Sequence, residues 1–113
     1  MANSFINKKV DLTTTDNTTL YTVPDANTAV IKSLLLSEDA GSGTTITVTL
    51  QDSSSNVFSL FKTKTISSNT TTELFTQPLV MEEKEILKVQ AGEANELHVI
   101  ASILQIQPRE VTT

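Results

Sequence analysis

Residues 78–106 read PLVMEEKEILKVQAGEANELHVIASILQI and decide the fold. We expect two strands here, Ile86–Ala91 and Glu96–Ile106, joined by the tight polar loop Gly92–Asn95. The second strand is apolar on both faces, with Leu97, Val99, Ala101 and Ile103 on one and Ile100, Leu104 and Ile106 on the other. A strand that is apolar on both faces belongs in the middle of a sheet. We therefore place the core around this strand.

Residues 81–91, MEEKEILKVQA, allow two interpretations. The segment is rich in good helix formers, which permits a short helix. However, Pro78 and Gly92 bracket a segment that is short for a helix. Glu82–Glu85 also has the character of a charged hairpin turn. We favour strand–turn–strand, with the short helix as the alternative.

Strand patterns continue on the N-terminal side of this stretch. In Thr28–Ser37, TAVIKSLLLS, the alternation predicts Ala29, Ile31 and Leu35 on one face, and Val30, Leu34 and Leu36 on the other. Thr44–Gln51 alternates as a half-buried antiparallel strand does. Further strands are expected at 20–23, 57–65, 70–75 and 79–81. About eight short strands with regular turn signals predict an all-β fold, an antiparallel β-sandwich or jelly-roll-like barrel.

Length and composition bound the architecture. The 113 residues suffice for one domain, so we expect a single β-sandwich domain over 1–113. Residues 1–12 are expected to form an N-terminal arm or an edge strand, and 107–113 a polar C-terminal tail. The chain has no cysteine, which excludes disulfides and Cys-based zinc sites and is compatible with folding in the reducing cytoplasm.

Charge and hydropathy argue against two partner classes. The net charge is −5, and Lys8, Lys9, Lys62 and Lys64 are too few for the basic face that nucleic-acid binding needs. We interpret them as solvated strand residues. The longest clean apolar run is Leu34–Leu36, and a spanning helix needs about 20 apolar residues. We expect neither a nucleic acid nor a membrane as a partner.

Residues that could carry chemistry are scattered. The one histidine, His98, lies inside the closing strand and is interpreted as structural. Glu82, Glu83 and Glu85 are interpreted as a charged turn. Ser37–Asp39 could offer oxygens to calcium but lacks the alternating Asp/Asn pattern of a dedicated loop. We expect no catalytic, cofactor-binding or metal-binding residues and no enzymatic activity, since one histidine and no cysteine cannot assemble a nucleophile–base set.

Two kinds of short sequence pattern match known functional motifs, but we assign no function to either. Gly41–Gly43 leads into a strand and not into a helix N-terminus, so it is not a phosphate loop. Asn17 and Asn69 each begin an Asn-Thr-Thr glycosylation pattern, which means little without a secretory signal.

Several segments resemble a known protein family. These are LYTVP at 20–24, TAVIKSL at 28–34, NTTTEL at 69–74, QPLVME at 77–82 and LKVQA at 87–91. They resemble small β-sandwich virion structural proteins of tailed bacteriophages, especially phages of marine and freshwater bacteria. The resemblance covers about residues 12–106. It departs at Glu82–Glu85, where such proteins commonly have a Gly-Asp turn.

The resemblance implies a structural role in a phage virion, assembled in the host cytoplasm. We expect a multi-copy accessory protein such as a capsid decoration or cement protein, or alternatively a neck, tail or fibre-attachment component. Partners would be the major capsid protein or neck and tail proteins. The chain itself is expected to be a homo-oligomer, such as a trimer, with its terminal segments in the interface.

A carbohydrate- or receptor-binding module is the alternative from another class. Sugar sites usually use aromatic platforms, whereas this chain has one Tyr, four Phe and no Trp. Phe5, Phe58, Phe61 and Phe75 are expected to lie in the core.

Overall fold

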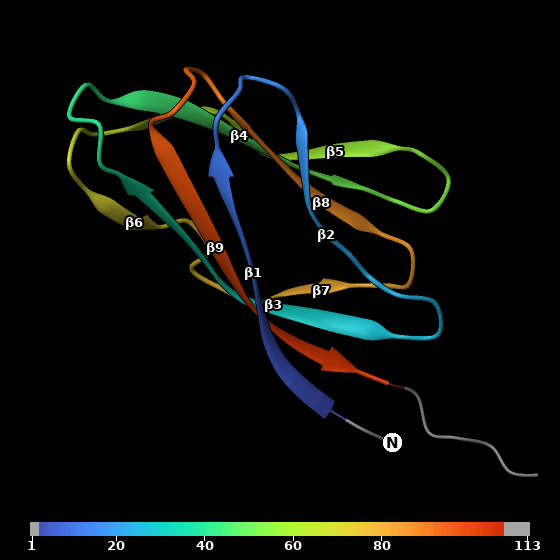
Figure 1. The fold of residues 1–113 in the computed structure, drawn as a ribbon. Coiled ribbons are helices and arrows are strands. Elements are labelled where there is room, and N and C mark those ends of the chain that lie inside the picture. Colours follow the sequence, from blue (N-terminus) through green and yellow to red (C-terminus); the bar gives the residue numbers. More distant parts are fainter. Residues whose placement is uncertain (1–2, 108–113) are drawn as a thin grey trace, which may run out of the picture.

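The computed structural model describes residues 3–107, which form strands and connecting turns without helix (Figure 1). Among these residues, none lies in a helix long and apolar enough to cross a membrane. The nine strands are β1 (Asn3–Leu12), β2 (Thr18–Thr22), β3 (Thr28–Glu38), β4 (Thr44–Gln51), β5 (Val57–Ile66), β6 (Thr71–Glu73), β7 (Leu79–Met81), β8 (Ile86–Ala91) and β9 (Leu97–Ile106). The tail expected at 107–113 falls, apart from Gln107, outside the described residues.

The strands form two antiparallel sheets. Sheet A has the order β1-β9-β3, with β6 and β7 both pairing with the other side of β3; sheet B has the order β2-β8-β4-β5. The chain changes sheet at nearly every connection, and only β4–β5 and β6–β7 stay within one sheet. This is the strand order of a jelly roll. The predicted all-β, jelly-roll-like sandwich is confirmed.

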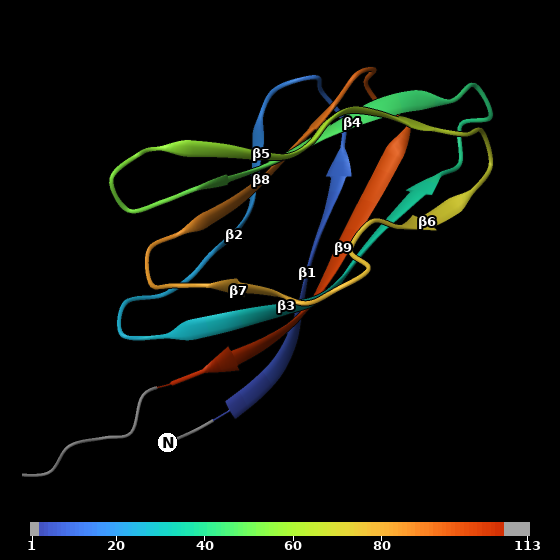
Figure 2. The same ribbon diagram turned by 180° about the vertical axis from the view of Figure 1, so that it is seen from behind.

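One edge of sheet A is a strand in two pieces. β7 pairs with Ala29–Ile31 and β6 with Leu35–Ser37, so the two follow one another along β3 (Figures 1 and 2). Between the two pieces, the Glu73 carboxylate accepts the backbone N–H of Leu34 at 2.8 Å and the hydroxyl of Ser33. The Glu73 side chain thus replaces the missing bond between strands, and the Leu34 N–H, which the gap would leave without an acceptor, is satisfied.

The core lies between the two sheets. Its sheet A members on β9 are Leu97, Val99, Ala101 and Ile103, the face predicted to be buried, and β9 runs centrally between β1 and β3 as expected. The Tyr21 hydroxyl on β2 donates to the Gln105 side chain on β9 at 2.7 Å, which joins the sheets at one end. Burial raises the pKa of Tyr21 above its ordinary value.

The predicted alternation of β3 is wrong in its second half. The pairing with β9 shifts between Ile31 and Ser33, so β3 contains a bulge at Lys32. One extra residue reverses which side chains face inward from that point on. Leu34 and Leu36 therefore join Ala29 and Ile31 in the core, while Leu35 faces outward.

The aromatic residues were predicted as core, and two are not. Phe5 is 79% exposed and Phe58 is 53% exposed. Phe61 and Phe75 stack with ring centroids 6.2 Å apart and pack against the core from its margin. The sequence pattern failed for Phe5 because β1 is an edge strand, with one face over the core and the other toward solvent.

Residues 81–91 form strand–turn–strand, as favoured above. β7 ends at Met81 and β8 begins at Ile86, with a turn closed by the bond from the Glu85 N–H to the Glu82 carbonyl at 3.1 Å. Lys84 has a φ of +67° in this turn, in the left-handed region that glycine adopts at least cost. The short helix is excluded.

Candidate assembly surface

The side of sheet A that faces away from sheet B, here called the outer A face, carries most of the exposed apolar side chains. Of the six large hydrophobic residues that are exposed, Phe5, Leu35, Val80 and Ile100 lie on it. The strand register places them in rows across the sheet. Exposed apolar side chains gathered on one face in this way are a mark of an interaction site.

The first row runs across four strands. Phe5 on β1 is opposite Leu104 on β9, Leu104 is opposite Val30 on β3, and Val30 is opposite Val80 on β7. The outermost members are the most exposed, Phe5 at 79% and Val80 at 61%. We call this set the Phe5 row.

A second row follows, further along the strands. Ile100 on β9 is opposite Leu35 on β3, and the row ends at Lys9 on β1 and at Glu73 on β6. It therefore has an apolar centre with a positive end and a negative end. We call this set the Ile100 row.

A shallow trough separates the two rows. Asn7 on β1, Ser102 on β9 and Ser33 on β3 share the intermediate register, and their side chains are short. The hollow at its β1 end measures about 400 Å³ and is lined by Phe5, Ile6, Asn7, Lys32, Ser102 and Ile103. The face is therefore ridged, with two apolar rows standing beside a polar trough.

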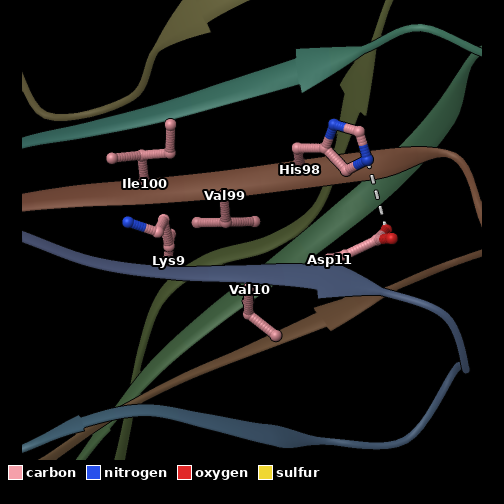
Figure 3. Close-up of a pocket in the computed structure, with 6 residues that line it drawn as sticks. All are labelled: Lys9, Val10, Asp11, His98, Val99 and Ile100. Atoms are coloured by element: carbon pink, nitrogen blue, oxygen red, sulfur yellow. Dashed lines mark ion pairs between the residues drawn. The ribbon is translucent and has the colours of Figure 1, made fainter.

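The last row holds His98. Asp11, His98, Ser37 and Thr71 lie opposite one another on β1, β9, β3 and β6. Figure 3 shows the imidazole directed toward Asp11, with Nε2 3.3 Å from the Asp11 carboxylate; Nδ1 lies 3.8 Å from Asp39 in the β3–β4 loop. His98 thus links two strands and a loop, in a half-exposed setting.

The opposite surface, the outer B face, is mostly polar, although Val57 on β5 and Ile86 on β8 flank Gln51 at one end of it. Thr49 on β4 is opposite Lys88 on β8, which is opposite Thr19 on β2, and Thr47 is opposite Gln90. A hollow of about 280 Å³ on this face is lined largely by hydroxyl and amide side chains. Polar groups on one face and apolar rows on the other give the sandwich two chemically distinct sides.

The carboxylate considered above for calcium has other partners. Glu38 is only 1% exposed, and its two oxygens accept backbone N–H bonds from Gly41 at 3.0 Å, Gly43 at 2.8 Å and Asn69 at 3.1 Å. The bond from Gly41, with those from Asn69 and Gly43, lowers the pKa of Glu38 to about 2. Glu38 therefore holds together the β3–β4 loop and the β5–β6 loop, and the backbone N–H groups of Gly41 and Gly43 bind its carboxylate.

A second buried carboxylate, Glu96, adjoins this cluster. The Ser42 hydroxyl donates to it and lowers its pKa, but Glu93, burial and Glu38 outweigh that bond, so the pKa of Glu96 is raised. Within residues 3–107, no group of three or more His, Cys, Asp or Glu side chains is arranged to hold a metal ion.

The remaining residues singled out in the sequence are dispersed. Glu83 accepts the backbone N–H of Ala26 at 2.6 Å, and Glu85 accepts that of Glu82 at 2.8 Å, so the charged turn is tied to its neighbours. The other four residues are exposed: Asn17 lies between β1 and β2, Lys62 and Lys64 lie two residues apart on β5, and Asn69 lies between β5 and β6.

The rows themselves were not predicted from the sequence. The available signal was the second apolar face of β9, namely Ile100, Leu104 and Ile106. We interpreted it as a sign of burial, whereas it marks an uncovered face in the single chain.

Comparison with known proteins gives resemblances of fold. No protein-family model and no curated protein matches the chain. A pentameric capsid protein isolated from metagenomic phage sequences is 19% identical with a TM-score of 0.43; the alignment covers 91% of this chain and 59% of that one. The chain therefore spans about three fifths of the length of that protein.

Two other solved structures are similar at the same level. The virus-like particle of the extra small virus of the giant freshwater prawn Macrobrachium rosenbergii is 10% identical, with a TM-score of 0.45 and coverage of 96% and 80%. The CBM22-1 and GH10 modules of Clostridium thermocellum xylanase 10B, complexed with xylohexaose, are 11% identical, with a TM-score of 0.42 and coverage of 82% and 19%. Likenesses at this level carry no functional argument.

Proposed function

We propose that this protein is a structural component of a tailed-phage virion, a multi-copy accessory protein such as a capsid decoration or cement protein. The observation that carries the proposal is the contrast between the apolar rows of the outer A face and the mostly polar outer B face. A protein that is covered on one side and hydrated on the other needs this distribution. The sequence resemblance to small β-sandwich virion proteins supports the same role.

On this proposal the outer A face is the assembly surface, and the partners are virion proteins, including copies of this chain. The protein acts as a single domain within the virion, without catalysis, cofactor, metal, nucleic acid or membrane. In the alternative, the protein lies in the neck or tail or at a fibre-attachment site and uses the same surface there.

A carbohydrate-binding role is less well supported by the geometry. Phe5 and Phe58 are the exposed aromatic rings, and they lie on different sheets, on β1 and β5. They cannot form one platform on which a sugar ring stacks. A glycan array with clear hits would nevertheless favour that role over a structural one.

Immunogold labelling of purified phage particles tests the position. Gold over the heads supports capsid decoration, and gold restricted to the neck or tail supports a neck, tail or fibre-attachment component. The absence of gold from intact particles, with the epitope shown to be accessible, would refute a surface virion role.

Incorporation of variants tests the surface. Val80→Asp places a carboxylate in the Phe5 row, and Val57→Asp places one at an equally exposed valine on sheet B, since the two are 61% and 60% exposed. We expect Val80→Asp to be lost from particles and Val57→Asp to be retained. Equal retention would show that the outer A face is not the assembly surface.

A further inference from the structure

We infer that the outer A face docks against the same face of a second copy of this chain, about a twofold axis that runs parallel to the strands between β9 and β3. The inference rests on the proposed function in one respect, because it names the partner of the same assembly surface. Its evidence is the self-complementarity of the rows described above.

The apolar residues match under this axis. A twofold rotation about a line parallel to the strands keeps each row at its own level but reverses the strand order in the facing copy. Phe5 of one copy then meets Val80 of the other, and Leu104 meets Val30. In the Ile100 row, Ile100 meets Leu35, so every apolar position of both rows faces an apolar position.

The charged ends match as well. Lys9 and Glu73 stand at opposite ends of the Ile100 row, so the same rotation brings Lys9 of each copy over Glu73 of the other. The dimer gains this pair twice. A twofold axis perpendicular to the strands through the trough would instead place Lys9 over Phe5 and Glu73 over Val80. Charge complementarity therefore selects the first axis.

The remaining polar groups on the face are accommodated by the same arrangement. Asp11 and His98 face Thr71 and Ser37 of the second copy, which are neutral, so no like charges meet in this row. Lys32, at the bulge of β3, is exposed and lies over the trough, where the hollow of about 400 Å³ leaves room for its side chain. Because β3 lies next to the axis, the two copies of Lys32 come to the same level on either side of it and form the one like-charged pair of this arrangement.

The size of the face is adequate for association. Four strands spaced about 4.8 Å apart and about ten residues long, at roughly 3.3 Å per residue, give a face of about 600 Å² before side-chain relief. Standard interfaces bury about 800 Å² on each partner. Relief from two apolar rows brings the outer A face near that size.

Sedimentation velocity of the purified protein provides the first test. We expect a concentration-dependent dimer, weakened about 100-fold or more by Val80→Asp because each copy loses an apolar contact and buries a carboxylate. Val57→Asp should leave the dimer unchanged. A monomer at all concentrations, or equal weakening by both variants, would overturn the inference.

Engineered cysteines test the axis, because the chain has none of its own. Asp11→Cys and Thr71→Cys are exposed positions outside the apolar rows, and the axis places them opposite each other in two copies. Sheets that pack face to face lie about 10 Å apart, beyond the reach of a disulfide, so a short bismaleimide, which adds both thiols without an oxidant, is used as the cross-linker. A mixture of the two single variants should form a cross-linked dimer, whereas neither variant alone should. Cross-linking of Asp11→Cys alone would place β1 against β1 and overturn the axis.

The two levels of proposal fail separately. If wild-type protein labels particles but does not dimerise through this face, the virion role stands and the twofold contact is wrong. If the dimer and its cross-link form but no particle is labelled, the contact stands and the virion role is wrong.

Discussion

Truncating Leu34 and Leu35 in turn tests the bulge of β3, because these neighbours change sides if the bulge is absent. Leu34 is fully buried, so Leu34→Ala removes about three carbons from the core and leaves a cavity, which should lower the free energy of unfolding by about 3–4 kcal/mol. Leu35 is 37% exposed, and water can fill the space that its truncation leaves. Leu35→Ala should therefore cost only about 1.5 kcal/mol.

The assay is thermal and urea unfolding, in a Val80→Asp background so that self-association does not contribute. For 113 residues the unfolding entropy is near 240 cal/mol/K, at about 2.1 cal/mol/K per residue, so the two variants should differ in Tm by about 8 °C. Leu36→Ala serves as a second core control and should behave as Leu34→Ala does. A larger loss for Leu35→Ala than for Leu34→Ala would refute the bulge and restore simple alternation from Ala29 onward.

Four other predictions follow from local contacts. Glu38→Gln should lower the Tm at pH 7. The pKa of Glu38 is lowered from 4.5 to about 2 in the folded protein, so its carboxylate stabilises the fold fully above pH 4.5, and this stabilisation is lost as the pH falls to about 2. The difference in Tm between Glu38→Gln and the wild type should therefore shrink over the same pH range. Glu96→Gln should instead raise the Tm at pH 7 and have little effect below pH 4.5, because its raised pKa makes the ionised form unfavourable; pH-dependent calorimetry of both variants checks the opposite signs. Tyr21→Phe should cost about 1 kcal/mol in urea unfolding by removing the bond between the sheets, and no loss would contradict that role. Gly92→Ala should destabilise, because a Cβ there would overlap the Thr45 hydroxyl, and Thr45→Ala should rescue it in the same assay.

Much of the fold could be predicted because most strands alternate regularly. The central position of β9 followed from its two apolar faces, since such strands rarely lie at an edge. The strand–turn–strand at residues 81–91 followed from its short length between Pro78 and Gly92. The inward set of β3 could not be predicted, because a bulge leaves no clear signal in TAVIKSLLLS and depends on pairing with β9.

The assembly surface was beyond sequence reasoning for a related reason. Phe5, Leu104, Val30 and Val80 are far apart in the chain and become a row only when the register is known. The pairing of Lys9 with Glu73 needs in addition a symmetry axis. Sequence indicates that β9 is apolar on both faces, but only the strand order shows which of those faces remains open.

The central place of β9 also fixes the order of events during synthesis. The four strands of sheet B are available for pairing once residue 91 has emerged from the ribosome. Of sheet A only the pairing of β3 with β6 and β7 can form by then, because β1 and β3 meet only through β9, which comprises residues 97–106. Until then a nascent chain displays two unpaired strand edges, which are templates for mispairing. Completion of the sandwich is therefore a late step, and a ribosome stalled before residue 97 would hold a chain in need of a chaperone.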